Sequence, residues 1–353
     1  MNKIIENLIF GIAATIVLVW FPLFAAAQAV RVEPKATPEA TAKPAQPNYP
    51  PYPTREAPLR LRPYDGANSE RAIKVDGNIN LSLCVTQGKV KVNGWNRNEL
   101  RVFVQDGSKF GYKVLQTSSK TNDPVWIMVV GIESKSKNAP ASECVWGGEI
   151  EIDAPVGATI NIKGRETTTT IDSVKKVNVN TIGGDISLRN ISNGITASAN
   201  QGDITVEESQ GGMILDTTTG NILVFEAGPG EIGDTFRAKT NSGSISLQKV
   251  EHRQIEVNSI SGSVAYNGDI LNGGSYSLST SKGSISLLLA GTTSCRISAT
   301  YGYGNFRTEI PIDIETENIT EGPIKSVVGK LGKGGDASIK LSTNNGSIVI
   351  RKQ

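Results

Sequence analysis

The sequence has few of the residues on which enzymes and metal proteins usually depend. It contains one histidine, three methionines and three cysteines in 353 residues, and aromatic residues make up only 6%. A Ser–His–Asp triad would have to use the one histidine, His252. No two cysteines stand close together, which argues against a zinc site. We therefore predict no catalytic residue, no cofactor and no metal.

His252 lies in a polar segment between two expected strands, flanked by Glu251 and Arg253. Polar neighbours on both sides are typical of a turn at the surface. We expect a solvated loop histidine rather than a catalytic base.

Helical periodicity is also missing. No sustained stretch beyond the first 29 residues repeats its apolar positions every 3.6 residues. The apolar residues, 38% of the chain, are mostly small and aliphatic, and 37 glycines accompany abundant Asn, Ser and Thr. This composition favours short strands joined by tight turns. The sequence predicts an all-β protein.

The net charge is low and gives no basic surface. It is +2 for the whole chain. Residues 30–63 contribute about +3 and the residues before them are neutral, so the remainder carries about −1. Nucleic-acid binding normally requires a basic stripe. Nucleic acid is therefore not an expected partner.

The first 29 residues have the pattern of a signal peptide. Lys3 precedes an apolar run from Leu8 to Phe24, and Ala27-Gln28-Ala29 fits the cleavage motif, with the cut after Ala29. The alternative is an uncleaved membrane anchor, since the run is near the short limit for spanning a bilayer. Both alternatives predict export, to the periplasm, the cell surface or the medium. Membrane contact is expected only through an uncleaved leader.

Residues 30–63 contain nine of the sixteen prolines. Proline fixes φ and removes a backbone donor, so this stretch cannot enter a sheet or helix. We expect a disordered, extended linker of polyproline type.

A glycine turn followed by a short apolar strand recurs through the second half of the chain. In each copy Gly is followed by Asp, Asn or Ser and then by an alternating strand, as in Gly202-Asp203-Ile204. The spacing is 18 to 23 residues, and the last interval of 42 corresponds to two periods. The turn glycines are Gly184, Gly202, Gly220, Gly243, Gly262, Gly283 and Gly346, with a weaker copy at Gly304.

A period near 20 residues fits one coil of a β-solenoid. We predict a single-stranded β-solenoid (β-helix), whose coils stack because one coil cannot bury its apolar row alone. An antiparallel sandwich with Gly-rich hairpins is the alternative. Residues 64–165 are expected to form a less regular N-terminal β region or cap, and residues 166–353 the repetitive solenoid. Within it, residues 310–335 interrupt the pattern and residues 337–350 return as a final coil.

The repeat resembles the bacterial putative-adhesin β-strand-repeat family. The likeness covers about residues 70–353 and includes the Gly-Gly-Ser-Tyr-Ser-Leu-Ser-Thr-Ser-Lys-Gly-Ser-Ile-Ser-Leu run at 273–287. The resemblance implies an exported β-solenoid at the envelope or surface. The family's function is largely undefined, and it supplies no catalytic residues.

The cysteines divide into an expected pair and an expected core thiol. Cys295 occupies the inward position held by Ile195, Ile255 and Tyr276 in other copies, so it should be buried and free. An exported chain meets an oxidising compartment. We therefore expect a disulfide between Cys84 and Cys144.

Three other features could form sites. Asp185 and Asp203 occupy equivalent turns and could bind calcium if stacked, but later turns carry Asn or Ser, so turn formation is the preferred interpretation. The threonine runs 167–170 and 217–219 should form polar outer faces, either as structural ladders or as a ligand-binding face. Exposed aromatics could stack on sugars or could close a coil: Tyr301, Tyr303 and Phe306.

These observations favour an exported, non-enzymatic, adhesin-like module that presents repetitive polar faces. The expected partner is a cell-surface or envelope protein or a glycan, held by many weak contacts. One alternative is an envelope scaffold that polymerises through its coils. The other is a polysaccharide-active β-helix enzyme, which would need an acid pair in a groove.

Overall fold

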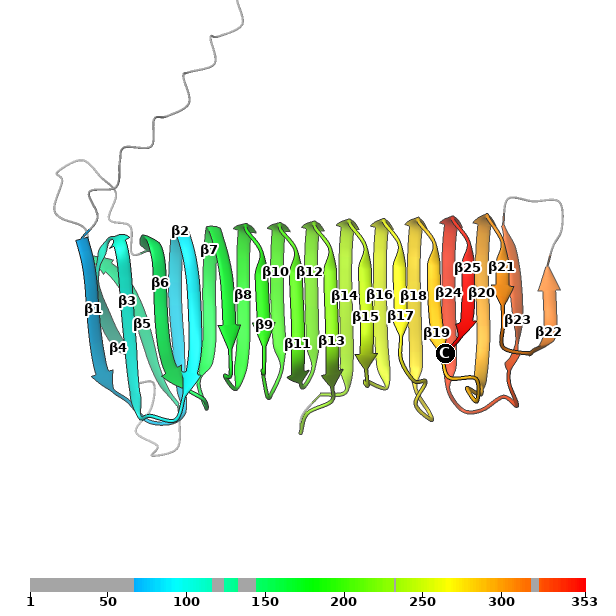
Figure 1. The fold of residues 1–353 in the computed structure, drawn as a ribbon, viewed down its shortest axis with the longest axis horizontal. Helices are drawn as coiled ribbons and strands as arrows, with labels where there is room; N and C mark the ends of the chain where they lie inside the picture. Colours follow the sequence, from blue (N-terminus) through cyan, green and yellow to red (C-terminus); the bar gives the residue numbers. More distant parts are fainter. Residues whose placement is uncertain (1–66, 116–123, 133–143, 232, 319–323) are drawn as a thin grey trace, which may run out of the picture. The chain divides into compact units, whose positions relative to one another are not determined.

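All regular elements of the described residues are β-strands. The computed structural model describes residues 67–115, 124–132, 144–231, 233–318 and 324–353, and Figure 1 shows their strands stacked side by side. The strands form one 25-stranded sheet that bends over two faces. The described ranges contain no helix that could cross a membrane. The expected leader and the proline-rich linker lie outside these residues.

The repetitive part consists of coils with two strands each. Every strand pairs in parallel with the equivalent strand of the next coil, with residues in register. This pairing confirms the expected solenoid and excludes an antiparallel sandwich for these coils. One strand of each coil lies on face A: β8 (Lys176–Gly183), β10 (Ile195–Gln201), β12 (Met213–Thr219), β14 (Thr235–Ser242), β16 (Gln254–Ser261) and β18 (Ser275–Lys282). The other lies on face B: β9 (Ile186–Arg189), β11 (Ile204–Gln210), β13 (Ile222–Gly228), β15 (Ile245–Val250), β17 (Val264–Asn267) and β19 (Ile285–Leu289).

The core lies between the two faces and follows from the alternation along each strand. Every second side chain points inward and is buried, while its neighbours face solvent. Because the register is kept, equivalent inward residues stack into continuous rows. One such row runs along face A through Ile195, Met213, Phe236, Ile255 and Tyr276. Each buried side chain of this size contributes roughly 1.5–3 kcal/mol of transfer free energy.

The N-terminal end is closed by strands that reverse direction. β2 (Ile79–Trp95) and β7 (Thr159–Asp172) each run through both faces. Beyond β2, face A ends with β5 (Val125–Ile132) and the antiparallel β4 (Lys109–Leu115). Face B ends with β6 (Val145–Pro155), then the antiparallel pair β3 (Glu99–Gly107) and β1 (Ala67–Lys74). Trp126 on β5 is 40% exposed and does not cover the core here, so the strands themselves close this end.

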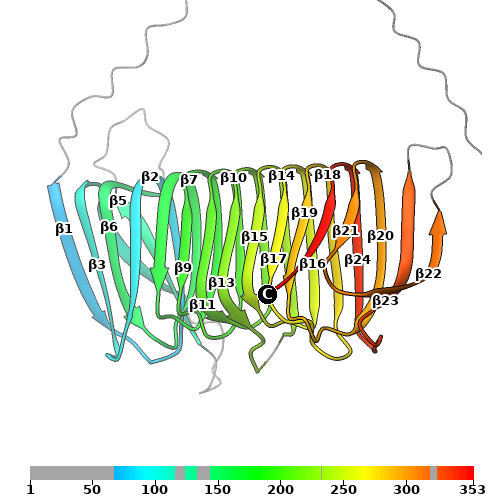
Figure 2. The same ribbon diagram turned by 45° about the vertical axis from the view of Figure 1, so that its right-hand side comes forward.

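The C-terminal end differs from the coil order that the spacing suggests. After β20 (Cys295–Tyr303) and β21 (Phe306–Thr308), the chain forms the hairpin β22 (Ile312–Asn318) and β23 (Lys325–Leu331). It then returns as β24 (Ser338–Asn345) and β25 (Ile348–Lys352). β24 pairs with both β18 and β20, so the last coil is inserted one place before the end of the stack. Figures 1 and 2 show these red strands between the yellow and orange ones.

Candidate interaction surfaces

The repeated glycines allow the backbones of neighbouring turns to touch. A Cβ atom on Gly262 would collide with the carbonyl oxygen of Gly243, and one on Gly243 would collide with that of Gly220. Gly346 meets Gly283 in the same way, and Gly304 meets Gly346, which fixes the unexpected order of the last coils. Glycine is needed here for close approach of the backbone.

The polar residues after most of these glycines connect one coil to the next. The Asp185 carboxylate accepts a hydrogen bond from the Asp203 backbone N–H at 2.9 Å, and the Asp203 carboxylate accepts one from the Asn221 N–H at 2.7 Å. Asn221 Oδ1 then accepts from the Ser244 N–H at 2.9 Å. Both carboxylates therefore take part in stacking the turns.

A row of hydroxyl groups, which we call the inner hydroxyl row, lies on the core side of these polar turn residues. Thr240 Oγ1 donates to the carbonyl of Gly220, the turn glycine of the preceding coil, at 2.9 Å. Ala199 occupies this position in one coil and leaves a gap in the row. The same bond recurs from Thr217, Ser259, Thr280 and Thr343 to the glycine carbonyls of their neighbours, at 2.8–3.1 Å.

The threonine run at 167–170 is not an outer face throughout. Thr167 and Thr169 are fully buried, whereas Thr168 and Thr170 are exposed. The prediction of an outward polar run is wrong for the two buried residues, because the period-two alternation of β7 turns every second side chain inward. Neither buried hydroxyl has a hydrogen-bond partner.

His252 is also placed differently from the prediction. Its side chain is fully buried and packs beside Phe236, with ring centroids 5.8 Å apart. Nε2 lies 2.9 Å from the Gly211 carbonyl, and Nδ1 has no partner. Burial lowers the pKa of His252, so the ring is neutral at pH 7 and donates from Nε2. The expectation of a solvated histidine is wrong because the ring turns inward from an otherwise exposed segment.

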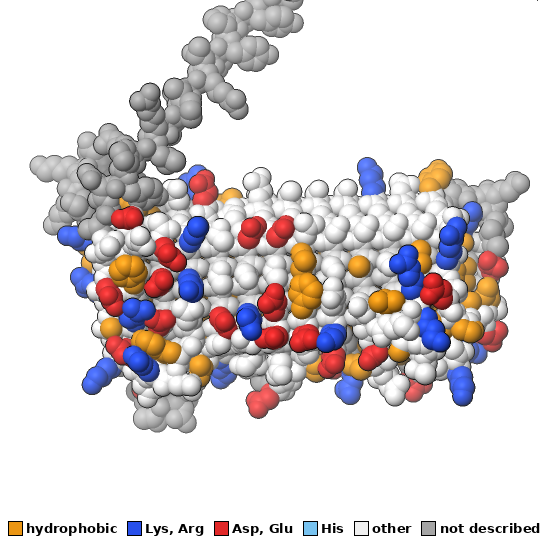
Figure 3. Space-filling model, in the orientation of Figure 1, with side chains coloured by type: hydrophobic (Ala, Val, Ile, Leu, Met, Phe, Trp, Pro, Cys, Tyr) orange, Lys and Arg blue, Asp and Glu red, His pale blue; other side chains and the backbone are white. Residues whose placement is uncertain are grey.

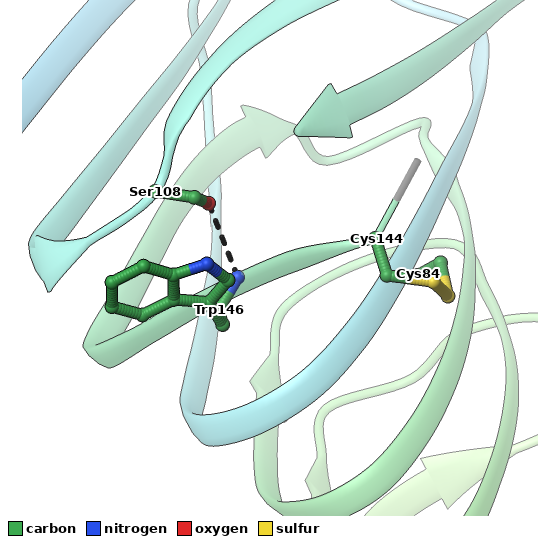
Figure 4. The surroundings of a disulfide bond; sticks show 4 residues. All are labelled: Cys84, Ser108, Cys144 and Trp146. Atoms are coloured by element: carbon green, nitrogen blue, oxygen red, sulfur yellow. Dashed lines mark hydrogen bonds between the residues drawn. A yellow bond between two sulfur atoms is a disulfide. The ribbon is translucent and has the colours of Figure 1, made fainter. Parts of the chain in front are cut away.

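A disulfide joins Cys84 in β2 to Cys144, the residue before β6 (Figure 4). Beside it, the Trp146 backbone N–H donates to Ser108 Oγ at 3.2 Å, which links β6 to the residue between β3 and β4. Cys295 is a buried free thiol, and burial raises its pKa to about 11. It is therefore a poor nucleophile near neutral pH.

The outer side of face A carries a patch of small neutral polar side chains near its C-terminal end. Across four neighbouring strands the register aligns Asn258, Ser279, Ser342 and Thr300. Asn258 Nδ2 donates to Ser279 Oγ at 2.9 Å, which orients both groups. We call these four residues, with Ser277 and Ser298, the hydroxyl patch. Sequence order alone does not reveal it, because Ser342 comes between Ser279 and Thr300 only through the inserted β24.

The three candidate aromatic residues are not equivalent. Tyr301 is buried and stacks on Phe306, with ring centroids 6.4 Å apart, so this pair helps to close the last coil. Tyr303 is 73% exposed and is the one available for a planar ligand. It is the last residue of β20 and departs from the two-residue alternation, which would otherwise place it on the inward side with Tyr301.

The charged side chains of the described surface form no large patch of one sign on the face shown in Figure 3. On the face shown in Figure 3, neutral atoms dominate the upper part and charged groups lie mainly lower down. A groove of about 460 Å³ on the face B side is lined by Glu208, Glu226 and Glu251. Arg189 pairs with Glu208 at 3.3 Å, and Lys249 pairs with Glu226 at 2.7 Å.

The two stacked faces, the in-register turns and the hydrophobic rows define a β-solenoid protein. The model of the Toastrack DUF4097 family matches residues 172–351, and the chain belongs to this family. The earlier resemblance to a putative-adhesin β-repeat family is thereby confirmed. No curated protein matches the sequence.

Several solved structures are similar to this chain. A putative adhesin from Bacteroides fragilis has 13% identity, covering 81% of this chain and 98% of its own, with a TM-score of 0.35. One from Parabacteroides merdae has 10% identity, 82% and 98% coverage, and a TM-score of 0.31. A putative lipid binding protein from Parabacteroides distasonis has 13% identity, 81% and 97% coverage, and a TM-score of 0.30.

Proposed function

We propose that this chain is an exported, non-enzymatic interaction module that binds a glycan or an envelope or cell-surface protein through face A. The observation that carries the proposal is the hydroxyl patch, in which aligned polar groups repeat from strand to strand. Neighbouring strands lie about 4.8 Å apart, which gives a ligand evenly spaced hydrogen-bonding groups. Many weak contacts along one rigid face would add up to useful avidity.

The patch suits an uncharged polar ligand better than a charged one. The row that contains Ser277 and Ser298 also holds Glu256, which is paired with Arg237, and Lys340, so its two charges have opposite signs. A glycan hydroxyl can donate to or accept from serine and asparagine side chains. The exposed Tyr303 lies on β20, the same strand as Ser298 and Thr300, and could stack on a sugar ring at the patch border.

A pull-down with insoluble polysaccharides tests the proposal. Cellulose, chitin and peptidoglycan are incubated with the purified chain, and bound protein is measured. The double variant Ser279→Arg/Ser342→Arg should lose binding to whichever polymer retains the wild type. Ser246→Arg/Ser286→Arg, which changes outward serines of face B, is the matched control and should bind normally. Equal retention of both double variants would refute the assignment of face A.

The same incubation separates binding from catalysis. Release of soluble sugars by the wild type would show that the chain is an enzyme and would overturn the proposal. In that case Glu226→Gln in the carboxylate-lined groove on face B should be tested first, because a glycosidase needs a carboxyl pair in a groove.

A further inference from the structure

Both ends of face A finish in an edge strand. At the C-terminal end β22 pairs with β23 and with no other described strand. At the N-terminal end β4 pairs with β5 and with no other described strand. Figure 1 shows the two strands at opposite ends of the stack. Each therefore presents backbone donors and acceptors on one side.

The directions of the two edges fit each other. β22 is antiparallel to β23, which is antiparallel to β20, so β22 runs in the same direction as the coil strands of face A. β4 is antiparallel to β5 and runs in the opposite direction. A second copy shifted along the stack, without rotation, would bring β22 against β4 as an antiparallel pair. Antiparallel pairing is slightly the more stable arrangement per residue.

The charges of the edges are complementary. β22 carries Asp313, Glu315 and Glu317 and no base, and β4 carries Lys109 and Lys113 and no acid. Glu315 is held by Lys330 at 2.9 Å. Two β22 edges would repel each other, and so would two β4 edges. The charges thus disfavour symmetric pairing and favour β22 against β4.

The apolar surfaces of the two ends also match. Face A extends two strands, β23 and β22, beyond the last coil, while face B ends at β21. Ile314 is on the inward side of this overhang and remains 46% exposed. At the N-terminal end, a cavity of about 250 Å³ lies between the outermost strands of the two faces. Its apolar lining is Ile73, Val75, Val114, Val125 and Ile127.

We propose that a second copy of this chain binds end to end, with β22 of one copy adding to β4 of the next and Ile314 entering the N-terminal cavity. Because the two surfaces differ and the operation is a translation, the contact does not close and produces a linear filament. The inference concerns the ends of the stack and is independent of any ligand on the hydroxyl patch.

A charge-swap experiment tests the contact. Sedimentation velocity of the full chain over a range of concentrations should show mass increasing with concentration. Asp313→Lys/Glu317→Lys and, separately, Lys109→Glu should each raise the concentration needed for association about tenfold or more. An equimolar mixture of the two variants should associate again, because its contacts alternate between two reversed edges and two wild-type edges, and both pairs are complementary in charge. Recovery in the mixture also shows that both variants are folded.

Lys340→Glu is the matched control, since Lys340 projects outward from β24 in the interior of face A. It should associate like the wild type. A wild type that remains monomeric at every concentration would overturn the proposal. Charge variants that associate as strongly as the wild type would also overturn it, because the contact would then lie elsewhere.

Discussion

The buried imidazole of His252 makes the stability of this protein dependent on pH. Burial lowers the pKa of His252 in the folded chain, whereas the unfolded chain has the ordinary value near 6.5. The unfolded state therefore binds the proton more readily. The stabilisation is complete above pH 6.5 and is lost as the pH falls through that value towards the folded pKa.

We accordingly expect the free energy of unfolding to fall by up to about 1.4 kcal/mol per pH unit below pH 6.5. Urea unfolding at pH 7.5 and at pH 5.5 measures the difference. His252→Gln is the control, since it removes the only histidine and can still donate to the Gly211 carbonyl. If the free energy of unfolding of His252→Gln falls with pH as steeply as that of the wild type, other groups cause the pH dependence.

The inner hydroxyl row permits a second test on single residues. Thr240→Val removes the hydroxyl that donates to the Gly220 carbonyl and should cost about 1–2 kcal/mol. Thr167→Val is matched in chemistry and burial, but its hydroxyl has no partner, so this change should be neutral or stabilising. Chemical denaturation of both variants measures the two effects. Equal losses would show that the hydrogen bond is not the cause.

The glycine turn sets the distance between neighbouring coils, so a change there affects two whole turns rather than one side chain. Gly262→Ala places a methyl group against the Gly243 carbonyl, and the backbone of two stacked turns would have to separate. We expect a loss of at least about 2 kcal/mol and a lower melting temperature. Gly228→Ala is the control: a Cβ atom there meets no atom within 4 Å, so this change should be nearly neutral.

The glycine turns and their strands can be predicted from the sequence, but the order of the coils in the stack is harder to predict. The glycine period and the two-residue alternation are local signals, and both correspond directly to turns and inward rows. The position of β24 is not local. The interval between Gly304 and Gly346 fits two periods whether the last coil follows β20 or is inserted before it. The hydroxyl patch depends on that insertion and could not be predicted.

His252 shows a similar limit for single side chains. Its flanking residues are exposed and polar, and they indicate a surface turn correctly. The direction of one ring within such a turn depends on space beside Phe236, which belongs to the preceding coil. For Thr167 and Thr169, by contrast, the two-residue alternation of β7 is visible in the sequence and correctly indicates that both side chains point inward.

At the scale of the whole molecule, the disulfide stabilises the irregular N-terminal region. It joins residues 60 positions apart, and closing a loop of that size stabilises the fold by about 4 kcal/mol in the chain-entropy model. Cys84→Ser/Cys144→Ser should lower the free energy of unfolding by roughly that amount. Added reductant should destabilise the wild type and a Cys295→Ala variant, but not the double variant. If reductant has no effect on the wild type, the cysteines are not paired.

Because β24 lies between β18 and β20, the coils cannot all dock in the order in which they are synthesised. The coils from β8 to β19 follow one another in space as they do in the chain, so each can add to a finished neighbour. The coil of β20 and β21 cannot, since its place beside β18 and β19 is taken by β24 and β25. Its docking must therefore wait until β24 and β25 have been synthesised. The end of the stack that carries the β22 edge is thus completed only after β25 has been synthesised.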